Sequence, residues 1–396
     1  MDQAGREQAR RLIEGNRRQS KACEGMRERG DVMTTGTTGT TGTAGAAGAM
    51  RTSAGDSVVV FGAYGHTGRF VVAHLRERGF VPVLSGRDAG KLRALAESAP
   101  GAEVRPASVD DAAALDRALA GAAAVINCAG PFATTAAPVI EAALRAGIPY
   151  VDVAAEIEAN VDTFARFTER ARAAGAVVVP AMAFYGGLGD LLATAALGDW
   201  TAADDIHIAY GLSGWHPTAG TRAAGEVSHR RRESRRVRYA NGRLEYHDDA
   251  PATVRWAFPE PMGKRAVIDD FTMADAVTIP SHVSVPDVHS YMTVEAARDL
   301  AAPDTPSPAA VDERGRSDQR FLVDVTVRFE GAERRAVARG QDIYAVTAPL
   351  AVEAVHRILT GRTRAVGVAS AGEIFDARDF LRALSGHLTV DFVSGS

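Results

Sequence analysis

A glycine-spaced turn directly after an apolar run constrains this chain more than any other feature. Val58–Phe61 is continuously apolar, as in a strand buried on both faces of a parallel sheet. Gly62, Gly65 and Gly68 follow in G-x-x-G-x-x-G spacing, and Arg69–Arg78 continues as an amphipathic run. The first glycine allows a tight turn, the second lets the backbone approach a diphosphate, and the third lets the helix pack against the strand. The segment therefore predicts a dinucleotide-binding turn.

The alternation of strand and helix patterns continues to residue 179. Gly147 and Gly175 each follow a helical pattern, where glycine suits a C-cap. Strict alternation of this kind indicates an α/β fold with a doubly wound parallel sheet of the Rossmann type. The further strands are expected at 80–84, 103–106, 123–128, 149–153 and 176–179, and the helices at 91–98, 111–120, 134–146 and 161–174.

The pattern changes after Pro180 and predicts a second, α+β unit with a mostly antiparallel sheet. Asn241-Gly242 between two alternating segments is a strong hairpin signal. We expect a glycine-rich connection at 181–190, helices at 191–197, 221–234 and 344–359, and a loop at 298–319. The other expected strands are 206–212, 236–239, 243–246, 266–268, 276–279, 290–294, 321–329 and 333–339. The domain boundaries are therefore placed at 56–180, 181–340 and 341–396, and the strand 365–368 and helix 377–384 are expected to return to the Rossmann unit.

Composition excludes several classes of protein. The net charge of −4 predicts no nucleic-acid binding, and no apolar stretch reaches the ~20 residues that span a bilayer. Two cysteines, Cys23 and Cys128, form no disulfide framework, which favours a cytoplasmic location. Residues 1–55 lack the apolar core of a signal peptide and include a low-complexity Thr-Thr-Gly tract, so we expect this segment to be disordered.

The end of the second strand favours NADP(H) over NAD(H). An NAD site usually carries an acidic residue here, whereas this chain has Ser85-Gly86-Arg87, with Lys91 one helical turn further on. The Arg87 fork suits a 2′-phosphate by charge and geometry, although a solvated surface arginine is the alternative. We interpret Asp88 as the N-cap of the next helix.

The fourth and fifth strands end in further candidates. Small residues after the fourth strand let the backbone pack against the nicotinamide ribose, and Cys128 among them has no histidine partner in the sequence that would make it a nucleophile. Asp152 and Glu156, after the fifth strand, are candidates to orient ribose or substrate, or to cap a helix. The predicted cofactor-binding residues are Gly62, Ala63, Tyr64, Gly65, His66, Thr67, Gly68, Ser85, Arg87, Cys128, Ala129, Gly130 and Pro131.

Four motifs in order resemble the cofactor domain of the saccharopine dehydrogenase-like family. They are Val58–Gly68, Ser85-Gly-Arg-Asp88, Val125-Ile-Asn-Cys-Ala-Gly-Pro-Phe132 and Tyr150-Val-Asp-Val-Ala-Ala-Glu156. The resemblance implies an NADP-binding Rossmann domain joined to a substrate and dimerisation domain, and hence a homodimer. It thins after Pro180, where the chain departs from the family pattern in the substrate region, so it does not fix the substrate.

Hydride chemistry also needs a proton donor. Tyr185 follows the sixth strand, and His216 lies in a glycine-containing turn with an imidazole pKa suited to proton transfer. Asp190 is a third candidate, which also suits a cap or a bond to the turn backbone. We predict Tyr185, His216 and Asp152 as the catalytic residues. No metal-ligand spacing occurs in the sequence.

Eight arginines gather between Arg222 and Arg243 in an otherwise acidic chain. This positive field suits an anionic partner, such as a phosphopantetheinyl carrier protein, a CoA thioester or a polycarboxylate substrate, and a solvated helix with an exposed strand is the alternative. The sequence predicts an NADPH-dependent reductase of an activated C=C (enoyl) or C=N (imine) bond in a small-molecule or carrier-bound substrate. A dehydrogenase of an amino-acid-derived secondary amine and a non-catalytic NADP-binding protein are the alternatives.

Overall fold

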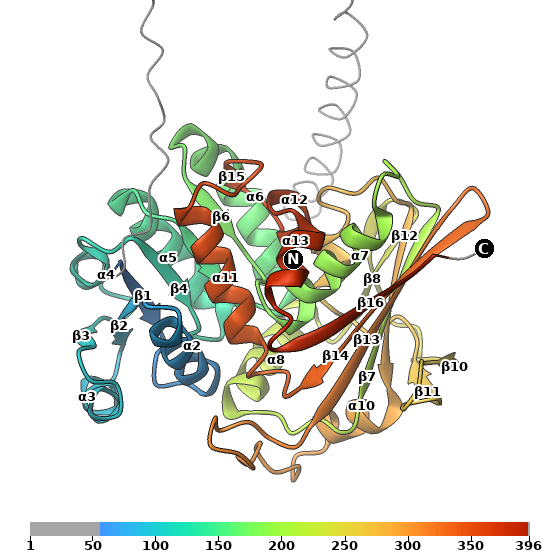
Figure 1. Cartoon of the computed structure of the whole chain (residues 1–396), viewed down its shortest axis with the longest axis horizontal. Helices are drawn as coiled ribbons and strands as arrows, with labels where there is room; N and C mark the ends of the chain where they lie inside the picture. The colour runs from blue at the N-terminus through green and yellow to red at the C-terminus, as the bar shows by residue number, and fades with distance from the viewer. Residues whose placement is uncertain (1–55, 395–396) are drawn as a thin grey trace, which may run out of the picture.

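The computed structural model describes residues 56–394, which form two sheets with helices packed on and between them (Figure 1). The predicted disorder of residues 1–55 lies outside the described part of the chain. One buried apolar cluster continues from the first sheet into the second, so the two units share a core.

The first sheet has seven strands in the order β15-β6-β5-β4-β1-β2-β3, and every pairing in it is parallel. The predicted doubly wound Rossmann-type fold is therefore confirmed. The strand order reverses between β1 and β4, and ligands of such sheets bind beyond the strand ends at this point. The strands are β1 (Ser57–Phe61), β2 (Val81–Gly86), β3 (Glu103–Pro106), β4 (Ala124–Asn127), β5 (Tyr150–Asp152), β6 (Val177–Val179) and β15 (Gly367–Val368).

The helices of this unit begin and end where local chemistry predicts. The Asp88 carboxylate accepts a hydrogen bond from the Lys91 amide at 3.0 Å, as expected of an N-cap. Gly147 ends α5 in the left-handed conformation with φ 67°. The helices are α2 (His66–Glu77), α3 (Ala89–Glu97), α4 (Ala112–Leu119), α5 (Phe132–Ala146) and α6 (Ile157–Ala173).

The second sheet is mostly antiparallel, as predicted, and only its β12–β7 pairing is parallel. Its main order is β10-β11-β12-β7-β13-β14-β16, and β8 joins β12 to β9. The predicted hairpin is present, with positive φ at Asn241 (54°) and Gly242 (72°). The strands are β7 (Asp205–Leu212), β8 (Arg236–Ala240), β9 (Arg243–His247), β10 (Thr253–Ala257), β11 (Lys264–Ile268), β12 (Asp287–Thr293), β13 (Arg320–Phe329), β14 (Ala332–Gln341) and β16 (Leu388–Ser394).

Three local predictions are wrong or incomplete. The strand expected at 276–279 is the short helix α9 (Asp275–Thr278), because a short apolar run does not distinguish strand from buried helix. The loop expected at 298–319 begins inside α10 (Val294–Ala301), whose apolar side packs on β11 and β12. The glycine-rich connection contains a buried, kinked turn, Phe184–Leu188, in which the backbone of Tyr185 and Gly186 is not helical. This turn leads directly into α7 (Gly189–Leu197).

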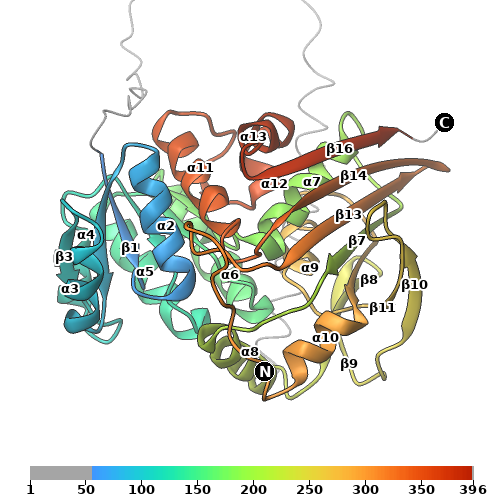
Figure 2. The same ribbon diagram turned by 60° about the horizontal axis from the view of Figure 1, so that its bottom comes forward.

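The last elements divide between the two units. β15 pairs with β6 and α11 (Thr347–Leu359) packs on α2, whereas α13 (Ala377–Ala383) packs on α7 and β16 pairs with β14. The short helix α12 (Ala371–Ile374) also packs on α7. Helix α8 (Ala219–Arg231) contacts α5 and α6 of the first unit, and Figure 2 shows it below them, beside α10. Within residues 56–394, no helix has the length and apolar character to cross a membrane.

Candidate functional site

A cavity of about 1070 Å³ lies where the parallel strands end and continues beneath α8 into the second unit. Residues that follow β1, β2, β3, β4, β5 and β6 all line it, which is the place expected for a ligand of a doubly wound sheet. Of the predicted site residues, the cavity is lined by Gly62, Tyr64, Gly65, His66, Thr67, Arg87, Cys128, Ala129, Gly130, Pro131 and Tyr185.

The glycine turn leaves a helix N-terminus open toward this cavity. Gly65 is the N-cap of α2, no side chain caps this end, and no acidic residue occupies its first turn. The first-turn amides of α2 therefore have no helical acceptor and suit an anion. Gly62 has φ +85°, and a Cβ there would lie 2.8 Å from the Ala129 amide nitrogen. The turn is thus built from glycines that an L side chain would displace.

Three predicted cofactor residues act from behind this turn. The Ser85 carbonyl accepts hydrogen bonds from the amides of Gly62 (2.8 Å) and Ala63 (3.2 Å), which fasten the turn to β2. A Cβ on Gly68 would collide with the Gly62 carbonyl oxygen, so this glycine allows the close approach of α2. Ala63, Gly68 and Ser85 therefore shape the turn, although they do not line the cavity.

The part of the cavity at the ends of β1 to β5, here called the cofactor arm, also contains the predicted Arg87. Arg87 is exposed and lines the cavity after β2, where no acidic residue stands at the strand end. The Lys91 ammonium lies 5.7 Å from the centre of the Tyr64 ring, on the same side of the turn. Ser108, after β3, also lines this arm, and the strand-end rule applied to β3 would have found it. The charge and hydrogen-bonding groups of these residues fit a 2′-phosphorylated ribose.

The ends of β4 and β5 meet around two buried groups. Burial raises the pKa of the Cys128 thiol, and the nearby Asp152 carboxylate adds to the effect, so Cys128 is protonated and unsuited to act as a nucleophile. Glu156 lines the cavity, and its Oε1 accepts a hydrogen bond from the Phe132 amide, 2.9 Å away, at the start of α5. Burial raises the pKa of Glu156 to about 7.

Asp152 holds the fold together and does not reach the cavity. Its carboxylate is fully buried and accepts from the amides of Ala154 (3.0 Å) and Ala181 (2.9 Å) and from the Tyr150 hydroxyl (2.9 Å). These bonds join the ends of β5 and β6, and residues that follow both strands line the cavity. We therefore revise its predicted catalytic role to a positioning role.

The structure separates the other two catalytic candidates. His216 does not line the cavity, and its Nδ1 lies 3.1 Å from the Pro306 carbonyl oxygen, so we withdraw its catalytic assignment. Tyr185 lines the cavity, but its hydroxyl is shielded from solvent and has no hydrogen-bond partner among the described residues. Burial raises the pKa of Tyr185 well above its usual value, so the phenol remains protonated.

Tyr344, which precedes α11, was not predicted as a site residue. Its hydroxyl accepts from the Trp215 indole nitrogen (3.1 Å) and lies 2.9 Å from the Thr221 hydroxyl, so it fastens the turn before α8. Tyr344 and Trp215 both line the cavity, and the Tyr344 ring packs edge-on against His66 at 5.2 Å. Nothing in the local sequence pattern marked this tyrosine, because its partners lie far away in the chain.

A buried polar cluster supports the floor of the site. The Tyr210 hydroxyl donates to Asp275, 2.9 Å from each carboxylate oxygen, and Asp190 lies 2.7 Å from His282 Nε2. Asp190 also accepts from the Gly372 amide at 2.7 Å, so this predicted donor candidate bonds to backbone. Burial raises the pKa of Asp275 to about 7.

This cluster predicts a fall in stability as the pH rises. The folded protein binds a proton on Asp275 that the unfolded chain loses near pH 4, so the stabilising effect disappears as the pH passes through about 7. We expect the contribution of Asp275 to the free energy of unfolding to decrease between about pH 4 and pH 7. Asp275→Asn, which preserves an acceptor for Tyr210, should reduce this decrease in urea titrations. An unchanged pH slope in the variant would contradict the assignment.

The arginine-rich segment does not form one free surface. Arg231 pairs with Asp162 at 2.7 Å, and Arg238 pairs with Glu245 at 3.2 Å. Arg232, Arg235 and Arg236 line the part of the cavity that lies in the second unit, here called the second arm. They also have partners within the protein: Arg235 pairs with Glu233 at 3.1 Å, Arg232 lies 3.9 Å from Glu158, and Arg236 donates to the Asp270 carbonyl at 2.9 Å. Three arginines of the segment therefore line the candidate site, whereas Arg231 and Arg238 form ion pairs outside the cavity lining.

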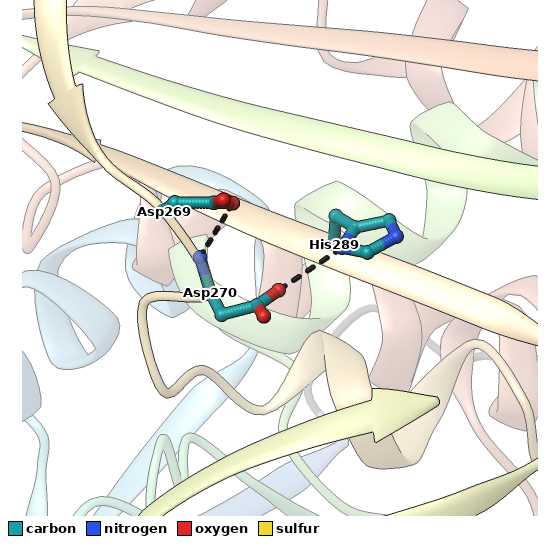
Figure 3. Close-up of side chains that lie close together, drawn as sticks. All are labelled: Asp269, Asp270 and His289. Carbon is teal, nitrogen blue, oxygen red and sulfur yellow. Dashed lines mark hydrogen bonds and ion pairs between the residues drawn. The ribbon is translucent and has the colours of Figure 1, made fainter. Parts of the chain in front are cut away.

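Asp269, Asp270 and His289 lie close together at the edge of β12 (Figure 3). His289 Nδ1 lies 3.0 Å from Asp270 Oδ1, and Asp269 Oδ1 accepts from the Asp270 amide at 2.9 Å. Burial opposes ionisation of Asp270, but its hydrogen bond with His289 and the charges of His289 and Arg238 lower its pKa. We interpret the group as an ion pair between β12 and the turn after β11.

Comparisons with known proteins agree with this geometry. Residues 58–179 match the family described as the saccharopine dehydrogenase NADP binding domain. A probable mitochondrial saccharopine dehydrogenase-like oxidoreductase of Arabidopsis thaliana is 30% identical over 142 residues, which cover 32% of this chain and 31% of that protein. A saccharopine dehydrogenase-like oxidoreductase of Mus musculus is 26% identical over 145 residues, covering 32% and 34%. The matched part is thus about a third of the length of these relatives.

The whole fold also has a counterpart among solved structures. Apo saccharopine dehydrogenase (L-Glu forming) of Saccharomyces cerevisiae superimposes with a TM-score of 0.58 at 13% identity, over 85% of this chain and 100% of that one. At this identity the likeness concerns the fold alone. The family match covers the glycine turn and the ends of β1 to β5, which form the cofactor arm of the cavity. Residues 58–179 therefore form an NADP(H)-binding domain of the saccharopine dehydrogenase type.

Proposed function

We propose that this protein is an NADPH-dependent oxidoreductase that reduces an activated C=C (enoyl) or C=N (imine) bond in an anionic substrate. The observation that carries the proposal is the continuity of the cavity from the glycine turn to the arginines of the second unit, which lie between α8 and β8, in β8 and on α10. When bound, NADPH supplies the hydride. Residues that follow β4 and β5 line the same cavity as the arginines of the second arm.

The charge of the second arm supports an anionic substrate. Four arginines of the second unit line the cavity, whereas among residues 56–394 the only acidic residues lining it are Asp110 and Glu156. Arg232 donates to the Ser228 hydroxyl at 2.8 Å, and its Nε has no partner among the described residues. The lining arginines are Arg232, Arg235, Arg236 and Arg298. Planar guanidinium groups bind carboxylates and phosphates with charge-assisted hydrogen bonds.

The direct test follows NADPH oxidation with two sets of compounds. One set contains the imines that pyruvate or 2-oxoglutarate forms with lysine, and the other contains crotonyl-CoA and its neutral short-chain thioester analogue. We expect turnover of an anionic member and a loss of ~10-fold or more in kcat/KM when the anionic group is removed, since charged hydrogen bonds contribute about 1.5–3 kcal/mol. Reduction of NADP⁺ by a secondary-amine dicarboxylate would favour the dehydrogenase alternative. Tight NADPH binding without turnover of any compound would favour a non-catalytic role.

Arg298→Gln tests the second arm directly. Arg298 is exposed on α10 and lines the cavity. Its removal should raise KM for the anionic substrate ~10-fold and change kcat little, because a group that binds substrate and transition state equally affects KM alone. Arg255→Gln on the exposed strand β10, outside the cavity lining, is the matched control and should change neither constant. If Arg298→Gln and Arg255→Gln changed KM equally, the anionic group of the substrate would not bind at Arg298.

A further inference from the structure

Glu156 occupies a distinctive position between the two arms of the cavity. It lies between β5 and α6, is 6% exposed, and lines the cavity beside the residues that follow β4. Its Oε1 is fixed by the Phe132 amide at 2.9 Å. The N-terminus of α5 thus orients the carboxyl group while leaving the second oxygen available.

That second oxygen, Oε2, is shielded from solvent and has no hydrogen-bond partner among the described residues. A buried, unpaired carboxylate oxygen is costly, whereas a protonated oxygen loses less on burial and can donate to a ligand. Asp152 on β5 and Glu158 on α6 add negative charge nearby and favour the protonated form. A positive charge on this side is that of Arg232, the residue after α8, which bonds to Ser228 and lies 3.9 Å from Glu158.

The other candidate donors are less suited to deliver a proton. Asp152 accepts three hydrogen bonds and does not line the cavity. Asp190 is bonded to His282 and to the Gly372 amide. Tyr185 also lines the cavity with a shielded hydroxyl that has no partner among the described residues, but burial raises its pKa well above the usual value for a phenol, so it is a much weaker acid than a carboxyl group. Glu156 combines a place in the lining, a fixed orientation and an unused oxygen.

We propose that Glu156 carries a proton on Oε2 and donates it to the substrate, a role that rests on the reductase function proposed above. The hydride adds two electrons to the substrate carbon, and the π pair of the C=N or C=C bond moves to the neighbouring nitrogen or carbon. The Oε2–H bond breaks as the new N–H or C–H bond forms. Glu156 remains as a carboxylate, stabilised by the Phe132 amide and the α5 N-terminus, and regains its proton from water.

The protonation state can be measured without a substrate. Infrared difference spectra across pH 5 to 9, on the free and the NADP⁺-bound protein, should show a protonated-carboxyl band that disappears near pH 7. Asp275, whose pKa also lies near 7, contributes to the same band. Glu156→Gln should therefore lose only the Glu156 component, and Asp275→Asn should lose the other. Glu141→Gln, a matched change on α5 at a residue that pairs with Arg170 outside the cavity, should retain both components. A Glu156→Gln spectrum at pH 5 identical to that of the unmodified protein would overturn the proposal.

Kinetics then separate this proposal from the proposed function. With the lysine imines or crotonyl-CoA as probe, Glu156→Gln should slow single-turnover NADPH oxidation ~100-fold and remove its decline above pH 7, as loss of a general acid does. The Kd for NADPH should remain within about twofold, because the amide preserves the acceptor for Phe132. Wild-type turnover with an unchanged rate in the variant would refute the role of Glu156 alone. Absence of turnover in both proteins would count against the reductase function and leave the infrared titration to decide on Glu156.

Discussion

Gly62→Ala is expected to weaken NADPH binding ~100-fold or more, because the new Cβ would lie 2.8 Å from the Ala129 nitrogen and 2.9 Å from its Cα. These are backbone atoms of the segment after β4 that lines the cavity, so the turn or that segment must move. The positive φ adds a cost of about 1–2 kcal/mol for any L residue. Fluorescence titration with NADPH measures the loss, and thermal unfolding measures the accompanying change in stability.

Gly79→Ala is the matched control for this prediction. Gly79 has nearly the same φ, +82°, but a Cβ there would meet no heavy atom within 4 Å. It should therefore lose stability by the conformational cost alone and retain its affinity for NADPH. Gly65→Val covers the case in which Gly62→Ala does not fold, because Gly65 has φ −65° and so carries no left-handed strain. Retained NADPH binding in Gly65→Val would show that the diphosphate lies elsewhere.

Arg87→Ala is expected to weaken NADPH binding by ~10- to 100-fold while NADH affinity changes less than about twofold, since only the 2′-phosphate meets this charge. The difference between the two cofactors should shrink as salt is added, because Arg87 is exposed and its interaction is screened. Arg93→Ala, on the exposed side of α3 and outside the cavity lining, is the control and should affect neither cofactor. Equal losses of NADPH and NADH affinity in Arg87→Ala would contradict the NADP assignment.

The cofactor arm was predictable because its signals are local. The apolar run of β1, the glycine spacing and the Asp88 cap each lie within a few residues, and parallel topology then brings the strand ends to one edge. The Asn241-Gly242 hairpin was predictable for the same reason. Edge strands β10 and β16 were missed, since Thr253–Ala257 is largely exposed and has no buried alternation to mark it.

The chemistry of the second arm depends on contacts between distant segments. The Phe132 amide that fixes Glu156 is 24 residues away, and Tyr344 holds Trp215 across 129 residues. Asp152 and Glu156 are both acids after one strand, yet one is enclosed by three donors and the other keeps an unpaired oxygen. No spacing rule distinguishes these two outcomes. The direction of the His216 side chain was likewise not predictable, because it is set by a tertiary neighbour, here the Pro306 carbonyl.

The central claim is that the cavity at the ends of β1 to β6 holds NADP(H). The most direct measurement compares the Kd values of NADPH and NADH for the unmodified protein in one buffer at low ionic strength. We expect NADPH to bind at least ~10-fold more tightly than NADH, as one charge-assisted contact to the 2′-phosphate requires. Equal affinity for the two cofactors, or no binding of either, would contradict the account.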